Sequence, residues 1–365
     1  MSRTPESILI VRLSAIGDVV HTMPCLHALR DAFPKARIGW LVEELSASLL
    51  RDHPEIDQLY AIPKKRWRQN KWRTVVGRER MRFYKQIRRD GWEVAIDFQG
   101  LTKSAMAMWR SGAKRRIGYG DADGRELSKL FYTDKVRPRG SAVHVIERNL
   151  ALLGPLGLER GADDVVWRFP DFHEEEASLR PFLDGIAADG PSSGEGSPDF
   201  IGLYPGAGWI TKRWPPEKFV ALARQLARQD GLPPMVLIWG PAEAEMVDAI
   251  IQQADLPAEK LRPAPPTNLR ELTALLGYCS VMVAGDTGPM HIAAALGKRV
   301  VGLYGGSDPV RNGPWGRGHI VLEMDDMPCQ PCWKRECPKG PGAPCMEGIA
   351  VELVSRAVSE IYFHL

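Results

Sequence analysis

The sequence predicts an α/β protein of two domains, each built on a parallel sheet with helices on both faces. The first observation is a set of short runs rich in Val, Ile and Leu, such as "SILIVRL", "RIGWLVE" and "EVAIDFQG". These runs are continuously apolar, which is typical of strands buried on both faces. The second observation is that longer amphipathic segments, such as "HTMPCLHALRDAF", separate them. The third is that the alternation starts again after residue 198, in a chain whose 365 residues suit two domains.

A change of composition near residue 184 marks the boundary between the two domains. The stretch "DGIAADGPSSGEGSPD" is rich in Gly, Ser, Pro and acidic residues and has little to bury, which predicts a flexible linker. The final stretch, "GIAVELVSRAVSEIYFHL", has the spacing of a helix. We therefore expect an N-terminal domain over residues 1–175, the linker over 176–198, a C-terminal domain over 199–345 and a terminal helix over 346–365.

Composition excludes several classes of protein. The chain is 44% hydrophobic and 25% charged. Its net charge is only +3, so the overall charge does not predict nucleic-acid binding. No apolar run is long enough to predict a transmembrane helix, and the N-terminus reads as a first strand rather than a signal peptide. Four of the six cysteines fall within residues 329–345, which is unlike a secreted disulfide framework and favours a reducing cytoplasm.

Common nucleotide and hydrolase motifs are missing. The sequence has no G-x-x-x-x-G-K-[ST], which disfavours a P-loop site, and no H-E-x-x-H or G-x-S-x-G. The first strand is followed by "SAIGDVV", which lacks G-x-G-x-x-G and disfavours a nicotinamide or flavin enzyme.

The turn "RLSAIGDVVHTMP" places Asp18 at the start of a helix that follows the first strand. One interpretation is a helix cap that complements the helix dipole, worth about 1 kcal/mol. The other is a carboxylate at the mouth of a cleft, placed to take a proton from a hydroxyl nucleophile.

In the second domain, the runs "FIGLYPGAG", "PMVLIWGPAE", "SVMVAGDTG" and "RVVGLYGG" each end in a glycine-containing turn. Ligands of open parallel sheets bind outside the carboxyl ends of the strands, so we expect these turns to face one cleft between the domains. In "YPGAGWITKRWPPEKF", Gly206 and Gly208 expose backbone N–H groups and Lys212 follows. This combination suits a phosphate, although a merely solvated lysine before a helix fits equally well.

Two further turns favour the phosphate interpretation. Glu243 in "WGPAEAE" either complements a helix dipole or accepts hydrogen bonds from ribose hydroxyls. In "GDTGPMH", Asp286 or Thr287 can cap the following helix, and Gly288 lets a ligand approach the freed N–H groups. Capping does not explain His291, which can donate to a phosphate oxygen, or the adjacent turn "YGGSDP". Together these turns favour a diphosphate-binding cleft.

Residues 64–89 form a basic tract with twelve Lys or Arg, one acidic residue (Glu79) and interleaved aromatic residues. Such a run is usually a solvated helical face, but it also suits RNA or anionic lipid headgroups. The tryptophans and arginines favour an anionic partner.

A cluster of cysteines has C-x₂-C-x₄-C-x₇-C spacing, which suits a structural zinc site or an oxidised loop as well as it suits four free thiols. Its members are Cys329, Cys332, Cys337 and Cys345. We expect a structural role at most.

Taken together, these stretches resemble the bacterial ADP-heptose:lipopolysaccharide heptosyltransferases, glycosyltransferase family 9. The resemblance covers most of the chain: "ILIVRLSAIGDVVHTMP", the tract near Arg66, "AIDFQGLTKSA", "TKRWP", "WGPAEAE", "DTGPMHIAAALG" and "YGGSDP". The tract over residues 66–68 and "DFQGLTKSA" are more similar to heptosyltransferase I, which adds the first heptose to Kdo. The family implies the GT-B fold, two Rossmann-like domains with parallel sheets facing a central cleft.

The resemblance implies an inverting, metal-independent transfer of heptose from ADP-heptose to an anionic, lipid-linked Kdo acceptor. It implies no required cofactor and no nucleic acid, and a peripheral location on the cytoplasmic face of the inner membrane. The residues that it assigns are Asp18 as base, Lys212 on the diphosphate, Glu243 on the ribose, Gly206, Gly208, Asp286, Thr287, Gly288 and His291 on the donor, and Arg66, Arg68, Gln99 and Lys103 on the acceptor.

Two other functions fit the same residues. One is a related GT-B transferase or epimerase that uses another nucleotide sugar. The other is a non-enzymatic RNA- or membrane-binding protein that uses the basic tract and a zinc-held cysteine loop.

Overall fold

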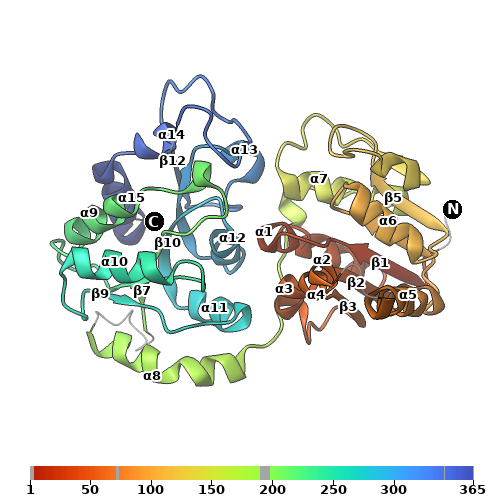
Figure 1. Ribbon diagram of the computed structural model, residues 1–365, viewed down its shortest axis with the longest axis horizontal. Helices are drawn as coiled ribbons and strands as arrows, with labels where there is room; N and C mark the ends of the chain where they lie inside the picture. Colours follow the sequence, from red (N-terminus) through yellow and green to blue (C-terminus); the bar gives the residue numbers. More distant parts are fainter. Residues whose placement is uncertain (1–3, 71–73, 190–197, 341, 365) are drawn as a thin grey trace. The chain divides into compact units, whose positions relative to one another are not determined.

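The computed structural model describes residues 4–70, 74–189, 198–340 and 342–364, and it divides into two compact units, Met1–Asp171 and Phe172–Leu365. Both units are α/β, as the alternating pattern predicts (Figure 1).

In the first unit, the described residues form a six-stranded sheet whose neighbouring strands all pair in parallel. The order along the sheet is β3-β2-β1-β4-β5-β6, which is that of a doubly wound Rossmann fold. The strands are β1 (Ser7–Val11), β2 (Arg37–Glu43), β3 (Gln58–Ile62), β4 (Val94–Asp97), β5 (Arg115–Tyr119) and β6 (Asp134–Val136). Every residue of β1 and β4 is buried, which explains why these runs are continuously apolar.

Helices connect these strands and cover the sheet (Figure 1). They are α1 (Ile16–Val20), α2 (Met23–Ala32), α3 (Glu44–Ala47), α4 (Lys64–Gln69), α5 (Thr74–Arg89), α6 (Thr102–Arg110) and α7 (Val145–Ala151). Short 3₁₀ turns lie at η1 (Ser48–Leu50), η2 (Ser128–Phe131), η3 (Gly154–Leu156) and η4 (Ala162–Asp164). The predicted basic tract forms α4 and α5, apart from residues 71–73, which lie outside the described residues.

The second unit repeats the same topology. Its described residues form a parallel sheet in the order β12-β11-β10-β7-β8-β9. Read from the other edge, this order is equivalent to that of the first sheet. Its strands are β7 (Phe200–Tyr204), β8 (Met235–Leu237), β9 (Leu261–Pro263), β10 (Cys279–Gly285), β11 (Arg299–Tyr304) and β12 (Ile320–Glu323).

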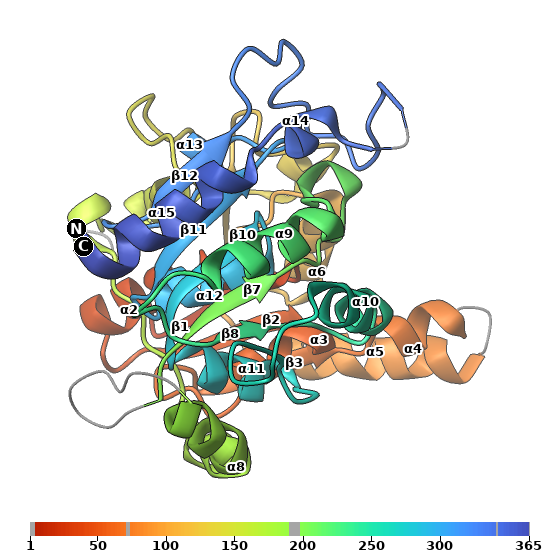
Figure 2. The same cartoon turned by 90° about the vertical axis from the view of Figure 1, so that its left-hand side faces the viewer.

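Three helices cover one face of this second sheet (Figure 2). Phe219, Ile250 and Val358 of these helices are almost fully buried in the core of the unit. The helix over Gly288–Ala295 is in contact with β10 and β11. The helices and 3₁₀ turn of the unit are α8 (His173–Asp189), η5 (Ile210–Lys212), α9 (Pro216–Leu226), α10 (Ala244–Ala254), α11 (Leu269–Leu276), α12 (Gly288–Ala295), α13 (Pro309–Asn312), α14 (Pro344–Glu347) and α15 (Val351–His364).

The expected flexible linker is only partly described. Residues 176–189 belong to α8, so this part of the prediction is wrong, and residues 190–197 lie outside the described residues. The physical reason lies in the apolar side chains of Leu179, Leu183 and Ile186, which are buried at helical spacing where α8 packs on α11. Within the described ranges, no helix is both long and apolar enough to cross a membrane.

Candidate active site

In each sheet, the strand order reverses at a central pair of strands: β1 and β4 in the first unit, and β7 and β10 in the second. The loops after such a pair diverge, and ligands of doubly wound sheets bind in the crevice that this leaves. Asp18 follows β1 and Gln99 follows β4, whereas Lys212 follows β7 and Asp286 follows β10. The fold therefore places the predicted residues at the two positions where ligand sites are expected.

In the second unit, Lys212, Asp286 and His291 form a buried triad. The Lys212 Nζ lies 2.5 Å from one carboxylate oxygen of Asp286, and the His291 Nε2 lies 2.9 Å from the other. The side chains of Asp286 and His291 are about 95% buried. Burial alone would raise the pKa of Asp286, but the hydrogen bonds and positive charge of His291 and Lys212 hold this pKa well below its usual range. Asp286 is therefore a buried carboxylate that fixes the Lys212 ammonium in place.

Glycine at position 285 permits this close approach, a role that the sequence did not reveal. A Cβ atom on Gly285 would lie 2.3 Å from the backbone oxygen of Lys212, closer than any side chain tolerates. The Gly immediately before "DTGPMH" is the signal that was available in the sequence.

The first turn of α12 is open to an anion. Thr287 occupies the N-cap position, but its hydroxyl donates to the Gly285 carbonyl (3.2 Å) and makes no capping hydrogen bond. The Asp286 carboxylate does not cap the helix either, because Lys212 and His291 occupy its oxygens. Thr287 is thus the N-cap residue, as predicted for Asp286 or Thr287, but neither side chain makes the capping hydrogen bond. The helix dipole and the first-turn N–H groups remain for a ligand near Gly288.

Glu243 and Gly206 lie together on the adjacent strand ends. Glu243 is at the N-cap position of α10, where its carboxylate accepts from the Gly240 amide (3.1 Å). A Cβ on Gly206 would lie 2.7 Å from the Glu243 Cγ, so glycine is required for this contact. A Cβ on Gly208 would meet no atom within 4 Å. We call Gly206, Lys212, Glu243 and residues 286–291 the second-unit site.

In the first unit, Asp18 is held but accessible. Its carboxylate accepts from the Ala15 amide (2.9 Å) and forms an ion pair with Arg12, and its side chain is 35% exposed. The buried Arg12 guanidinium also donates to the Phe98 carbonyl and so connects the ends of β1 and β4. The sequence reading missed Arg12, although an arginine directly after an apolar strand is a signal for a polar contact at the strand end.

Gln99 and Lys103 border the turn that carries Asp18. The Gln99 side-chain oxygen accepts from the Leu13 amide (3.0 Å), so this residue holds the backbone of the turn. The Lys103 ammonium lies 3.5 Å from the Ser14 hydroxyl and 3.4 Å from a Glu43 carboxylate oxygen.

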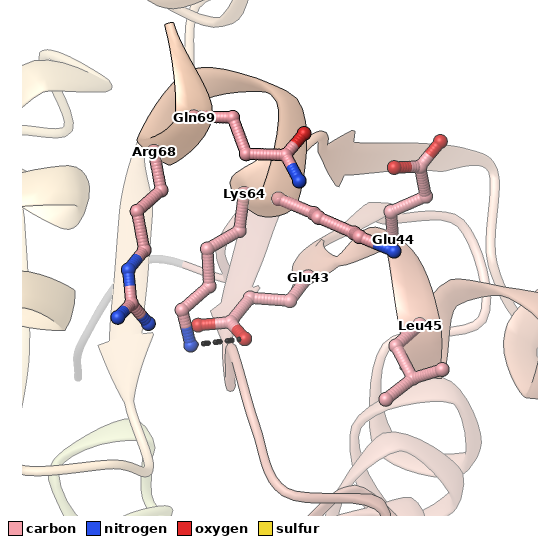
Figure 3. A pocket seen from close by; sticks show the side chains of 7 residues that line it. Glu43, Glu44, Leu45, Lys64, Arg68 and Gln69 are labelled. Carbon is pink, nitrogen blue, oxygen red and sulfur yellow. Dashed lines mark hydrogen bonds and ion pairs between the residues drawn. The ribbon is translucent and has the colours of Figure 1, made fainter. Parts of the chain in front are cut away.

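Glu43, at the end of β2, is the centre of a basic pocket (Figure 3). It accepts from Lys64 (2.7 Å), and Arg68 extends along the same pocket. The pocket has a volume of about 760 Å³ and is lined by Glu43, Glu44, Leu45, Lys64, Lys65, Arg68 and Gln69. Arg66, which was grouped with Arg68 from the sequence, pairs with Glu79 of α5 instead and does not line the pocket. The sequence reading also missed Glu43. We call Asp18, Gln99, Lys103 and this pocket the first-unit site.

All four clustered cysteines are free thiols. Burial raises the pKa of the Cys345 thiol, and the charges of Cys332, Cys337 and Cys329 raise it further. Across the described parts of the chain, no three His, Cys, Asp or Glu side chains are arranged to hold a metal ion, so their arrangement does not fit the zinc alternative.

Two Rossmann-type units in one chain are the architecture of the GT-B fold. Solved structures agree with this fold. The E. coli heptosyltransferase WaaC with ADP matches with a TM-score of 0.73 and 24% identity, covering 97% of this chain and 99% of that chain. WaaC has also been solved with ADP-2-deoxy-2-fluoro heptose. A glycosyl transferase of family 9 from Veillonella parvula gives a TM-score of 0.80 at 23% identity and covers 100% of this chain and 99% of that chain.

The sequence comparisons identify the family. Residues 80–342 match Glycosyltransferase family 9 (heptosyltransferase). Lipopolysaccharide heptosyltransferase 1 of Pseudomonas aeruginosa PAO1 is 30% identical over 331 residues, which cover 90% of this chain and 87% of that protein. The enzyme of the same description from Escherichia coli K12 is 27% identical over 86% of this chain and 92% of its own length. The chain belongs to glycosyltransferase family 9, and the protein is a glycosyltransferase.

Proposed function

We propose that this protein transfers a heptose from ADP-heptose to a Kdo-bearing, lipid A type acceptor during synthesis of the lipopolysaccharide inner core. The observation that carries the proposal is the Lys212–Asp286–His291 triad beside the open first turn of α12. A fixed ammonium and helix N–H groups together bind a diphosphate. The names of the related heptosyltransferases and the nucleotides bound to WaaC support ADP-heptose as the donor.

Each part of the donor has a residue of the second-unit site for it. Lys212 and the amides at Thr287 and Gly288 hold the diphosphate, and the Glu243 carboxylate accepts from the ribose hydroxyls. The missing side chain at Gly206 leaves room for Glu243 to take this position, and the space next to Gly208 is open. Asp286 and His291 act through Lys212, whose ammonium they position.

The chemistry is a displacement with inversion at the anomeric carbon. A hydroxyl of the acceptor attacks that carbon, its proton passes to the Asp18 carboxylate, and the bond from the anomeric carbon to the terminal phosphate oxygen breaks. Negative charge grows on the departing diphosphate, where Lys212 and the α12 amides stabilise it. These groups supply the charge that a divalent cation supplies in many sugar transferases, so we expect the reaction to need no metal.

The acceptor carries carboxylates and phosphates, which match the cations of the first-unit site. Lys64, Lys65 and Arg68 line the pocket around Glu43, and Lys103 reaches the same carboxylate. We assign the acceptor to this pocket, whereas Arg66 contributes only to the general positive charge of α4 and α5.

A neighbouring face of this unit suits an anionic membrane surface, in keeping with a peripheral location on the cytoplasmic face of the inner membrane. Met81 and Trp109 are 70% and 54% exposed there. They border a pocket whose other lining residues include four cations and no carboxylate: Lys85, Arg88, Arg110 and Arg116. Apolar side chains within a cationic rim favour anionic headgroups. Sedimentation with phosphatidylglycerol vesicles, but not with phosphatidylcholine vesicles, is the expected result.

A transfer assay tests the proposed function. The purified protein is incubated with ADP-heptose and Kdo-lipid A, without added metal and with a chelator, and both ADP release and heptosylated lipid are measured. We expect stoichiometric formation of both products. Transfer from a UDP-sugar instead, or tight salt-sensitive RNA binding without turnover, would contradict the proposal in favour of one of the other functions.

A further inference from the structure

The loop that carries Cys329, Cys332 and Cys337, which we call the cysteine loop, is attached to the segment that carries Lys212. This loop lies between β12 and α14, and its backbone oxygens at Arg335 and Lys334 accept from the Ile210 amide (3.1 Å) and the Thr211 hydroxyl (2.5 Å). Ile210 and Thr211 belong to η5, which ends at Lys212.

A second set of contacts joins the same loop to the "YGGSDP" turn. The Trp333 amide donates to the Gly306 carbonyl (2.7 Å), and the Gly306 amide donates to the Thr211 carbonyl (2.8 Å). A Cβ on Gly306 would lie 2.5 Å from the Thr211 hydroxyl oxygen, so the packing requires glycine. The cysteine loop is thus a structural neighbour of the second-unit site, not a separate appendage.

The loop brings a second cation to Lys212. The Lys212 ammonium lies 4.7 Å from the centre of the Trp209 ring, and the Arg335 guanidinium carbon lies 5.7 Å from the same ring. Because both cations lie at the same ring, they are at most about 10 Å apart. This separation is about the Debye length at 0.1 M salt, so the two charges still interact. Arg335 is exposed, and none of the ion pairs found among the described residues includes it.

Lys212 and Arg335 differ in how much of their charge is free to interact with a ligand. The charge of Lys212 is shared with the buried Asp286 carboxylate, whereas no ion pair found within the described ranges engages the Arg335 guanidinium. Two cations at one aromatic ring repel each other, and an anion bound near both reduces this repulsion. The guanidinium is also the group best suited to bind a phosphate through two parallel hydrogen bonds.

We propose that Arg335, presented by the cysteine loop, is a donor-binding residue that contacts the terminal phosphate of the nucleoside diphosphate. The inference rests on the proposed function, because it takes the ligand of the second-unit site to be ADP-heptose. When the sugar leaves, the terminal phosphate gains negative charge, so the contact with Arg335 strengthens as the bond breaks. Cys332 and Cys337 lie on either side of Arg335 in the sequence.

Binding of ADP and AMP to variants of the full-length protein tests this assignment. Arg335→Ala is compared with Lys339→Ala, a matched control on the same loop whose ammonium lies 3.6 Å from the Met327 sulfur. Calorimetry is expected to show ADP affinity about tenfold lower in Arg335→Ala, AMP affinity within about twofold of wild type, and no change in Lys339→Ala. Arg335→Lys, which keeps the charge but loses the paired hydrogen bonds, is expected to fall between wild type and Arg335→Ala.

The remaining outcomes contradict the assignment in distinguishable ways. If wild type binds ADP and Arg335→Ala binds it equally well, Arg335 does not contact the donor. Equal losses of ADP and AMP affinity in Arg335→Ala would show that the substitution disturbs the whole site, which also rejects a specific phosphate contact. If wild type itself binds neither nucleotide, the proposed function fails first.

Discussion

The ammonium of Lys212 lies 2.5 Å from a carboxylate oxygen of Asp286, and this contact joins the loops that follow the two central strands of the second sheet. Because β7 and β10 pair directly, the two loops leave the sheet side by side. The lysine is therefore fixed before any ligand arrives, so little reorganisation is needed when charge develops on the leaving diphosphate.

Replacing Lys212 by alanine is expected to lower kcat/KM for heptose transfer by at least about 100-fold, because the main fixed charge on the diphosphate is lost. The variant also leaves Asp286 buried with only His291 as a partner, which we expect to lower the free energy of unfolding by about 1–3 kcal/mol. Steady-state kinetics and urea denaturation measure the two effects. Lys260→Ala, at an exposed lysine of the same unit, is the control and should leave both quantities unchanged.

The depressed pKa of Asp286 predicts a specific loss of stability in acid. A carboxyl group whose folded-state pKa lies below its unfolded value stabilises the fold above the unfolded pKa, and this stabilisation is lost as the pH falls toward the folded pKa. The unfolded value is about 3.9, so the advantage of wild type over Asp286→Asn should shrink by about 1 kcal/mol between pH 7 and pH 3. Urea denaturation at both pH values measures the free energy of unfolding of each protein. If wild type and Asp286→Asn differ by the same amount at both pH values, the pKa of Asp286 is the same in the folded and unfolded states.

Gly206→Ala and Gly208→Ala form a matched pair. A Cβ at position 206 collides with Glu243, whereas one at position 208 meets open space. We expect Gly206→Ala to raise the KM for ADP-heptose about tenfold, since Glu243 must move away from the ribose, and Gly208→Ala to change it by less than about twofold. Similar KM values for ADP-heptose in both variants would show that donor binding does not depend on the position of Glu243.

Arg66 and Arg68 should differ as acceptor-binding residues. Arg68 lines the pocket around Glu43, but Arg66 pairs with Glu79. Arg68→Ala is therefore expected to raise the KM for Kdo-lipid A about tenfold, and Arg66→Ala by less than about threefold. The KM for ADP-heptose provides the internal control, because both arginines belong to the first unit. A larger effect from Arg66 would place the acceptor on the other side of α4.

The regular features of the fold could be predicted from the sequence because they follow from local patterns. Continuous apolar runs marked the buried strands, and glycine-rich turns marked the strand ends that carry Lys212 and Asp286. The use of Arg12, Glu43 and Gly285 could not be predicted, since each depends on a segment far away in the chain that only the sheet order brings close. The helix at residues 173–189 was missed for the same reason: its burial depends on packing against α11.

The capping interpretation of "GDTGPMH" shows how a local rule fails at a ligand site. Short polar residues before a helix usually cap it, but Asp286 is used by Lys212 and His291, and Thr287 bonds to Gly285. The uncapped first turn is what makes the helix terminus available to an anion.

The rate of heptose transfer by Asp18→Asn tests the central claim most directly. Asparagine keeps the shape of the side chain and an oxygen for the Ala15 amide, but it cannot take a proton. Under single-turnover conditions, with ADP affinity measured in parallel, we predict a transfer rate lower by about 100- to 10,000-fold and an ADP affinity equal to that of wild type. Transfer by Asp18→Asn within about threefold of the wild-type rate would contradict the assignment of Asp18 as the base.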